Sequence, residues 1–266
     1  MKVIVLGGTG MLGHVVFEYL FSKYKDDVIF SSRGSALDSS FHFDALLSDY
    51  NSIPDCDYII NCIGIVKPLI SKSVENAIII NSLFPILLAK YCKQKNIRLI
   101  HITTDCVFSG QKGKYVEDSF HDALDIYGKT KSLGESCQNE SMVIRTSIIG
   151  EEIKSCLNLI EWVKSQKGKQ VNGYTNHLWN GVTTLQYAKI CDQIIEKDLY
   201  KEGLYHVFSD IVSKYDLVSM INEYFGLNIT VKPFEAGVSC DRTMLTNKKL
   251  NSILNIPIIK KQIWEM

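Results

Sequence analysis

The chain has 266 residues, of which 46% are apolar and 22% are charged, and its formal net charge at pH 7 is zero. That length suits one large domain, or a nucleotide-binding domain with a smaller partner. The neutral charge leaves no broad basic surface for a nucleic-acid backbone, and no uninterrupted apolar run is long enough to predict a membrane span.

The first half of the chain alternates between strand and helix patterns. Short runs rich in β-branched residues predict strands over residues 2–6, 28–32, 41–43, 57–64, 98–104 and 142–147. Apolar residues at helical spacing predict helices over residues 11–24, 75–95 and 127–137. Pro85 should kink or break the second of these helices. The alternation predicts an α/β fold, in which helices cover both faces of a parallel sheet.

The second half is less regular. Helical spacing recurs over residues 157–166, 183–197 and 213–226. Residues 203–208 form a strand pattern that is expected to rejoin the sheet. The boundary near residue 150 has no flexible linker. We therefore expect a nucleotide-binding domain over residues 1–150 and a second unit over residues 151–266. About residues 184–209 should return to the sheet, so that the two units interleave.

A glycine-rich loop follows the first strand. Gly7, Gly10 and Gly13 form G-x-x-G-x-x-G at the start of a helix. Glycine allows a tight turn and a close approach of a pyrophosphate, which the free N–H groups of the helix start can bind. The pattern predicts a dinucleotide site, although a plain turn would have the same appearance. The loop residues expected at the cofactor also include Thr9, Met11 and Leu12.

The second strand ends in "SSRG", where a carboxylate would favour NAD. Ser32 and Arg33 instead suit the 2′-phosphate of NADPH, so NADP(H) is preferred and NAD(H) remains possible. Arg33 could equally be a solvated loop residue. Asp44 could accept a hydrogen bond from the adenine amino group or cap the next helix. The expected cofactor site is completed by residues at the end of the fourth strand: Cys62, Ile63 and Gly64.

Tyr127 and Lys131 are four residues apart in a predicted helix and share one face of it. A lysine ammonium in that position can lower the pKa of a phenol. The same spacing recurs at residues 19/23 and 91/95. Those two pairs lie late in their helices, at the opposite edge of the sheet. Tyr127 follows the carboxyl end of a strand, where open α/β sheets bind ligands.

Several motifs carry a family resemblance. The segments "GGTGMLG", "TTDCVFSG", "YGKTKSLGE" and "IRTS" resemble extended short-chain dehydrogenase/reductases. The group most similar is the dTDP-4-dehydrorhamnose reductases, whose C-terminal half resembles "GLYHVFSD", "SKYDL" and "DRTML". The resemblance implies a Rossmann-type, doubly wound parallel sheet with a smaller, interleaved C-terminal substrate-binding lobe. It also implies that Thr104, Tyr127 and Lys131 are catalytic.

The resemblance implies an oxidoreductase that reduces a 4-keto nucleotide-linked deoxysugar with NADPH, for cell-surface polysaccharide precursors. Tyr127 would protonate the developing alkoxide, and Lys131 would hold the nicotinamide ribose. The Thr104 hydroxyl would hydrogen-bond the same oxygen. Asp105 would orient Thr104 or the sugar, or would only cap the loop.

Departures from the group pattern leave the sugar and the nucleotide open. Cys106 replaces the usual tyrosine, and Val182 stands where proline is usual. A 4,6-dehydratase would have a glutamate at the position of Cys106. The absence of that glutamate favours simple reduction over dehydration. Two alternatives remain: an epimerase with retained NAD, and a non-catalytic NADP-binding regulatory subunit like that of methionine adenosyltransferase.

The substrate candidates are Asn81, Trp179 and Arg242. Trp179 could stack on a base or sugar, and Arg242 could pair with a diphosphate. Packing or local ion pairing would explain each of them equally well. The expected partner is a nucleotide sugar, without nucleic acid or membrane, and a homodimer is possible. Eight cysteines without a C-x-x-C pair suit a reduced, cytoplasmic protein, and six scattered histidines predict no metal site.

Overall fold

The computed structural model describes residues 1–34, 39–47, 49–153 and 156–266. A seven-stranded sheet lies at its centre, in the order β11-β6-β5-β4-β1-β2-β3. All neighbouring strands in it pair in parallel. The strands are β1 (Val3–Leu6), β2 (Val28–Ser32), β3 (Ser40–His42), β4 (Tyr58–Asn61), β5 (Arg98–Thr103), β6 (Met142–Arg145) and β11 (Gly203–His206). The order reverses between β1 and β4, which places a ligand crevice at their carboxyl ends.

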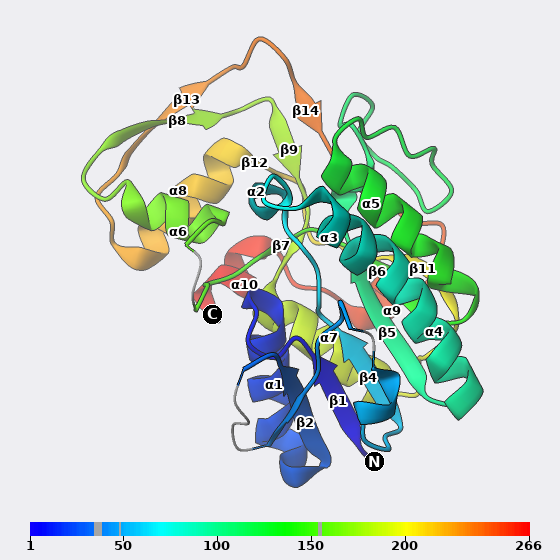
Figure 1. Ribbon diagram of the computed structural model, residues 1–266. Helices are drawn as coiled ribbons and strands as arrows, with labels where there is room; N and C mark the ends of the chain where they lie inside the picture. Colours follow the sequence, from blue (N-terminus) through cyan, green and yellow to red (C-terminus); the bar gives the residue numbers. More distant parts are fainter. Residues whose placement is uncertain (35–38, 48, 154–155) are drawn as a thin grey trace.

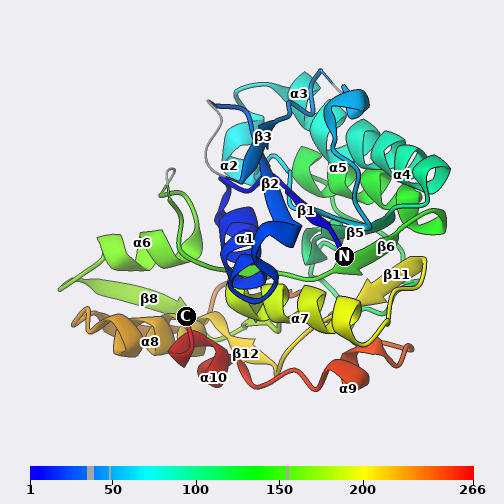
Figure 2. The same cartoon turned by 90° about the horizontal axis from the view of Figure 1, so that it is seen from below.

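The alternation of side chains along β1 divides the core into two layers. Val3 and Val5 pack in a cluster with α1 (Met11–Tyr24) and α7 (Thr184–Glu196). Ile4 and Leu6 face the opposite layer, beneath α4 (Phe84–Lys95). Successive residues of a strand point to opposite faces, so this one short run supports both layers. The fold is the doubly wound α/β arrangement that the alternating pattern predicts (Figure 2).

The long helical run before β5 does not break at Pro85. It passes from α3 (Val74–Ile78) through a π-helical turn, η3 (Ile79–Leu83), into α4. Pro85 has no N–H for the Asn81 carbonyl, and the wide turn accommodates this missing bond. Residues 74–95 are also apolar and long enough to cross a membrane by those criteria alone. Their apolar side chains include Phe84 and Leu88, which pack in the sheet core.

A smaller lobe lies beside the carboxyl ends of the strands, at upper left in Figure 1. Its core contains Trp179, Leu217 and Ile263. Its helices are α6 (Leu159–Ser165), α8 (Lys214–Phe225) and α10 (Ile259–Trp264). Its strand pairs are β8 (Gln170–Tyr174) with β13 (Thr230–Phe234), and β9 (His177–Trp179) with β12 (Val212–Ser213) and β14 (Cys240–Asp241).

Short elements connect the two units. The pair β7 (Ile148–Ile149) and β10 (Val182–Thr183) leads out of the sheet and back toward it. α7 then packs beside α1, and β11 pairs with β6, before the chain enters the lobe again at β12 (Figure 2). The remaining elements are α2 (Lys67–Ile70), α5 (Ile126–Gly134), α9 (Leu250–Leu254), η1 (Lys25–Asp27), η2 (Tyr50–Ser52), η4 (Asp105–Val107) and η5 (Glu135–Asn139).

Candidate active site

The glycine loop between β1 and α1 is tightly folded. Gly7 has φ +82°, and its N–H donates to Ser31 Oγ at 2.9 Å. A Cβ atom on Gly13 would lie 2.1 Å from the Gly7 carbonyl oxygen, so only glycine lets α1 begin this close to the loop. Gly10 is the N-cap of α1 and supplies no capping side chain. The first N–H groups of the helix therefore point at a site suited to an anion.

A cavity of about 400 Å³ opens over this loop. Most of the residues expected at a cofactor line it, namely Gly7, Thr9, Gly10, Met11, Ser32, Arg33, Asp44, Cys62, Ile63 and Gly64. Leu12 packs in the core instead, and Gly13 packs against Gly7. The wall also contains Phe43, Ala45 and Leu46, an apolar segment around Asp44 that the sequence patterns did not indicate.

Two side chains show how this cavity suits a phosphorylated dinucleotide. Ser32 Oγ is buried without a hydrogen-bond partner among the described residues, and Arg33 beside it is exposed. A 2′-phosphate would satisfy the hydroxyl and would pair with the guanidinium. Asp44 Oδ1 accepts from the Leu46 N–H at 3.0 Å, so it caps the local turn.

Tyr127 and Thr104 come together across the end of β5. α5 is capped by Asp125, and Gly128 allows it to approach the loop after β5, because a Cβ there would lie 2.3 Å from the Cys106 carbonyl oxygen. Tyr127 is half-buried, and its phenol interacts with the Thr104 side chain. Burial, more than the neighbouring Cys106, raises the pKa of Tyr127 above its ordinary value. The phenol is therefore fully protonated near neutral pH.

Thr104 is itself fixed by its neighbours. Its Oγ1 donates to Asp105 Oδ1 at 3.1 Å and accepts from the Cys106 N–H at 3.1 Å. Asp105 is buried and therefore orients the Thr104 hydroxyl. Burial raises the pKa of the Cys106 thiol to about 12, so this cysteine is not a ready nucleophile.

Lys131 connects α5 to the cofactor cavity. Its ammonium is buried and donates to the Ile102 carbonyl at 3.2 Å. A Cβ on Gly64, which lines the cavity, would lie 3.5 Å from Lys131 Nζ. Burial lowers the pKa of Lys131 to about 8, although the nearby Glu135 opposes this shift. The ammonium thus lies beside the cofactor cavity, within one helical turn of Tyr127.

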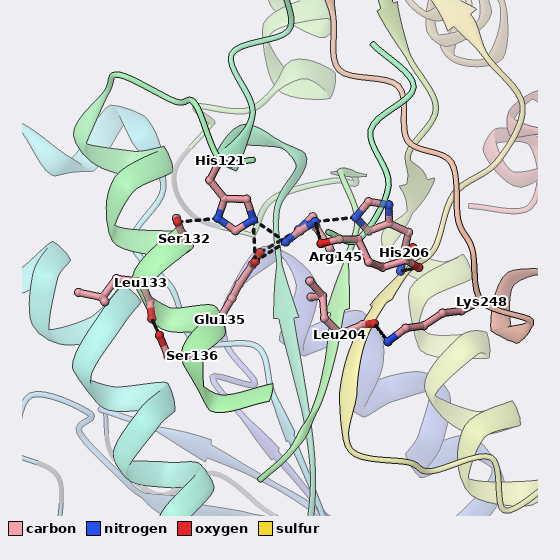
Figure 3. A network of polar contacts seen from close by, with 10 residues as sticks. His121, Ser132, Leu133, Glu135, Ser136, Arg145, Leu204, His206 and Lys248 are labelled. Atoms are coloured by element: carbon pink, nitrogen blue, oxygen red, sulfur yellow. Dashed lines mark hydrogen bonds and ion pairs between the residues drawn. The ribbon is translucent and has the colours of Figure 1, made fainter. Parts of the chain in front are cut away.

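A buried ion pair anchors α5 from behind (Figure 3). Arg145 on β6 donates from Nε to Glu135 Oε1 at 3.0 Å and from Nη2 to Oε2 at 2.5 Å. Its Nη1 bonds His206 Nε2, and its Nη2 bonds His121 Nε2, each at 2.7 Å. His121 also bonds Ser132 on α5 at 2.6 Å. The network borders a second cavity of about 420 Å³ and holds α5 against the sheet.

The substrate candidates lie in different environments. Asn81 bonds both backbone groups of Ile65, at 2.8 and 3.0 Å, and bonds Thr130 Oγ1 at 3.3 Å. Asn81 therefore connects the π turn to the loop after β4, which contains Ile65, and to α5, which contains Thr130. Arg242 Nε donates to the Phe108 carbonyl at 2.9 Å. Within the described ranges, no group of three or more His, Cys, Asp or Glu side chains is placed to hold a metal ion.

Trp179 is only 4% exposed. Its ring faces Lys214, whose Nζ lies 5.3 Å from the ring centroid. The sequence patterns did not single out Lys214. The one available signal was its position at the start of a helix, where a positive charge opposes the helix dipole.

The comparisons with known proteins identify the family and the fold of the chain. A family model described as RmlD substrate binding domain matches residues 1–260. The dTDP-4-dehydrorhamnose reductase of Aggregatibacter actinomycetemcomitans is 28% identical over 190 residues, which cover 65% of this chain and 64% of that protein. Methionine adenosyltransferase 2 subunit beta of Xenopus tropicalis is 24% identical over 250 residues, which cover 85% of this chain and 72% of that protein.

Solved structures show the same fold. A hypothetical dTDP-4-dehydrorhamnose reductase from Sulfolobus tokodaii superposes with a TM-score of 0.76 at 24% identity, covering 96% of this chain and 94% of the other. The dTDP-4-dehydrorhamnose reductase of Bacillus anthracis, solved with NADP, gives a TM-score of 0.76 at 20% identity, with 99% and 97% covered.

Proposed function

This chain belongs to the RmlD substrate-binding-domain family of extended short-chain dehydrogenase/reductases, and from that premise we propose that it reduces a 4-keto nucleotide-linked deoxysugar with NADPH. The product would enter cell-surface polysaccharide synthesis. The observation that supports this most is the placement of Thr104, Tyr127 and Lys131. Thr104 follows β5, Tyr127 and Lys131 share one face of α5, and Lys131 Nζ lies near Gly64, which lines the cavity over the glycine loop.

The residues of this chain divide the chemistry among them. When bound, NADPH supplies the hydride. The glycine loop binds its pyrophosphate, and Ser32 and Arg33 take the 2′-phosphate. Tyr127 holds a proton at its phenol oxygen and gives it to the alkoxide that forms on the sugar. Thr104 donates a hydrogen bond to the same oxygen, and Lys131 binds the nicotinamide ribose.

NADPH fits the cavity better than NADH, because Arg33 is exposed at its rim and Ser32 Oγ has no partner among the described residues. NADH remains a usable cofactor in this proposal, since the glycine loop reads only the pyrophosphate. In this proposal residues 1–150, together with the returning segment at about residues 184–209, form the cofactor domain, and the rest of residues 151–266 supplies most of the sugar-nucleotide site.

The test is a screen of NADPH oxidation against dTDP-, UDP- and GDP-linked 4-keto-6-deoxysugars. We expect one nucleotide series to be reduced with stoichiometric loss of NADPH, which an epimerase with retained NAD would not show. Tyr127→Phe should lower kcat about 10²- to 10⁴-fold and leave NADPH binding intact. Turnover by this variant at the wild-type rate would rule out the assigned mechanism.

A second candidate rests on the match to methionine adenosyltransferase 2 subunit beta, which covers 85% of this chain. In that case the chain binds NADP without turnover and regulates a partner enzyme. Purification from native cells would then yield one stoichiometric enzyme partner, and no ketosugar in the screen would be reduced. Reduction of any ketosugar with catalytic turnover favours the reductase.

A further inference from the structure

His121 lies in the loop between η4 and α5, and both nitrogens of its ring have a partner (Figure 3). Arg145 Nη2 lies 2.7 Å from Nε2, and Ser132 Oγ lies 2.6 Å from Nδ1. A guanidinium can only donate hydrogen bonds, so Nε2 has to accept. The hydrogen of the neutral ring is therefore on Nδ1 and is donated to Ser132. These two partners fix the ring as one neutral tautomer.

The same guanidinium fixes a second histidine. Arg145 Nη1 donates to His206 Nε2 at 2.7 Å, and the Nδ1–H of His206 donates to the Leu245 carbonyl at 2.7 Å. His206 is fully buried, and burial lowers its pKa to about 4. The His121 side chain is 26% exposed and lines the cavity of about 420 Å³. Of these two histidines, His121 is therefore the one that protons from the solvent can reach.

A proton on Nε2 would break the bond between Arg145 and His121, because an imidazolium has no lone pair with which to accept. It would also bring two positive charges together. The new N–H would face Glu135 Oε2, which lies 3.4 Å away and already binds the Arg145 guanidinium. The carboxylate cannot stay fully paired with both cations, so the network has to rearrange.

The charged groups around the ring act on this protonation in both directions. Burial lowers the pKa of His121 below its ordinary value of 6.5, and the charge of Arg145 adds to this shift, whereas Glu135 and Asp122 oppose it. Asp122 is itself held by the Ser109 backbone N–H at 2.7 Å and hydroxyl at 2.6 Å. The ring is therefore neutral at neutral pH and gains a proton only on acidification. The other charged side chains that line the cavity are Glu117, Asp118 and Lys248.

The network contacts α5 at the turn that carries Lys131. Ser132 directly follows this lysine, and Glu135 follows one turn later. We propose that His121 is a positioning residue for α5, and that it holds this helix only while its ring is neutral. The inference rests on the proposed function, since α5 also carries Tyr127. Reduction uses Tyr127 and Lys131 in their protonated forms, so acid does not impair them directly. Protonation of His121 supplies the loss of activity at low pH that these two groups do not.

The experiment compares the pH dependence of kcat in wild type, His121→Gln and His121→Leu, with NADPH and the ketosugar nucleotide found in the screen. Glutamine keeps an acceptor and a donor but does not titrate, whereas leucine has neither. We expect the wild-type kcat to fall about tenfold between pH 7 and pH 5, because small displacements of a catalytic group are costly. This fall is the acid limb of the profile.

His121→Gln should be within about threefold of wild type at pH 7 and should lack the acid limb, since no group titrates at that position. His121→Leu should have a kcat about tenfold lower at pH 7, and its profile should also lack the acid limb. Because His121 acts on α5 and not on the substrate, the KM for the ketosugar nucleotide should change far less than kcat.

His177→Gln is the matched control. His177 is also half-buried, and its Nε2 lies 3.1 Å from the Val238 carbonyl in the lobe. This variant should keep the acid limb of the wild type. Circular dichroism reports whether each variant is folded, and His121→Gln carries the test if the leucine variant does not fold. Loss of the acid limb in the control contradicts the assignment, because the effect would then not be local.

Two measurements do not depend on turnover. Nitrogen NMR of the imidazole rings should show His121 as the Nδ1–H tautomer at neutral pH and its protonation below pH 6.5. The signal is assigned by its absence from His121→Gln. Calorimetry of NADP binding at pH 7 and pH 5.5 should show a loss of affinity that is about three- to tenfold larger in wild type than in His121→Gln, because Lys131 lies on the displaced helix. Both proteins bind the same cofactor, so the titration of its own phosphate cancels.

An Nε2–H tautomer of His121 at neutral pH overturns the inference, and so does an acid limb that is unchanged in His121→Gln. If the wild type still reduces a ketosugar nucleotide in either case, the proposed function stands without the inference. If no ketosugar is reduced, the proposed function fails. The tautomer and the pH dependence of NADP binding then decide whether His121 holds α5, and equal pH dependence in wild type and His121→Gln counts against it.

Discussion

At Lys131, burial and charge act in opposite directions on one ammonium. Burial lowers its pKa to about 8, and Glu135 one turn later raises it. The ammonium loses its proton as the pH rises through about 8, so the charged form, which would hold the ribose in the proposed function, is present below about pH 8. The phenol of Tyr127 has a raised pKa and stays protonated over the same range. At neutral pH the two groups are therefore in the protonation states that the proposed function requires.

A pH series of NADPH binding tests this. We expect the affinity of the wild type to fall as the pH rises through about 8, because the neutral amine gives up its charge-assisted bond. Lys131→Met should bind more weakly at pH 7 and should lack that inflection. An unchanged inflection in Lys131→Met would assign the titration to another group.

At the scale of elements, Pro85 and Gly134 set the distance between the long helical run and α5. Pro85 leaves the Asn81 carbonyl without its usual helical N–H partner. A Cβ on Gly134 would lie 2.1 Å from that carbonyl oxygen. The contact joins two backbones, so neither can yield as a flexible side chain would. It positions the helix that carries Tyr127 and Lys131.

Gly134→Ala should therefore push α5 away from the π turn. We expect a loss of about 1–3 kcal/mol in the free energy of unfolding, as overpacking usually costs, together with a lower kcat. Urea unfolding and turnover measure the two effects. Gly237→Ala is the control, since no atom lies within 4 Å of its added Cβ. Equal stability of the two variants would contradict the close contact.

The ion pair behind α5 allows a second comparison. Glu135→Ala leaves the fully buried Arg145 without its carboxylate, and we expect a loss of about 3–5 kcal/mol. Lys93 and Glu202 form an exposed pair at 2.5 Å, and Lys93→Ala should cost less than about 1 kcal/mol. Urea midpoints of the two variants give the contrast. Similar losses would mean that Arg145 finds another partner.

The sequence predicted the elements of the central sheet and missed the exposed strands of the lobe. β1, β4 and α1 bury apolar side chains with regular spacing, so their patterns were sufficient. The lobe strands β8 and β13 are largely exposed and had no such pattern. The helical run passes Pro85 without a break through a π turn, and this turn contacts Gly134, which lies 49 residues after Pro85 in the sequence. Local spacing carries no information on that contact.

At the scale of the whole molecule, the cofactor cavity touches both units. Glu152 and Asn158 line it from the lobe side, and Asn158 Nδ2 lies 2.9 Å from Met11 Sδ at the glycine loop. A bound cofactor is thus in contact with the sheet and with the segment that leads to α6. The site residues at the glycine loop followed from the sequence, but these lobe contacts depend on how the two units pack.

NADPH should therefore stabilise the molecule as one unit. At about 100 times Kd, binding adds about 2.7 kcal/mol, which corresponds to a rise in Tm of roughly 5–10 °C for a chain of this size. Differential scanning calorimetry should show one transition that moves as a whole. Two transitions, of which only one moves, would mean that the lobe unfolds independently.

The return of α7 and β11 to the sheet has a consequence for engineering new substrate specificity. The lobe consists of two stretches of chain, on either side of the α7–β11 excursion. Grafting the lobe of a relative onto this scaffold therefore needs matched junctions before α7, after β11 and near residue 150, not a single fusion point. A chimera joined only near residue 150 would import a foreign edge strand next to β6 and a foreign helix against α1.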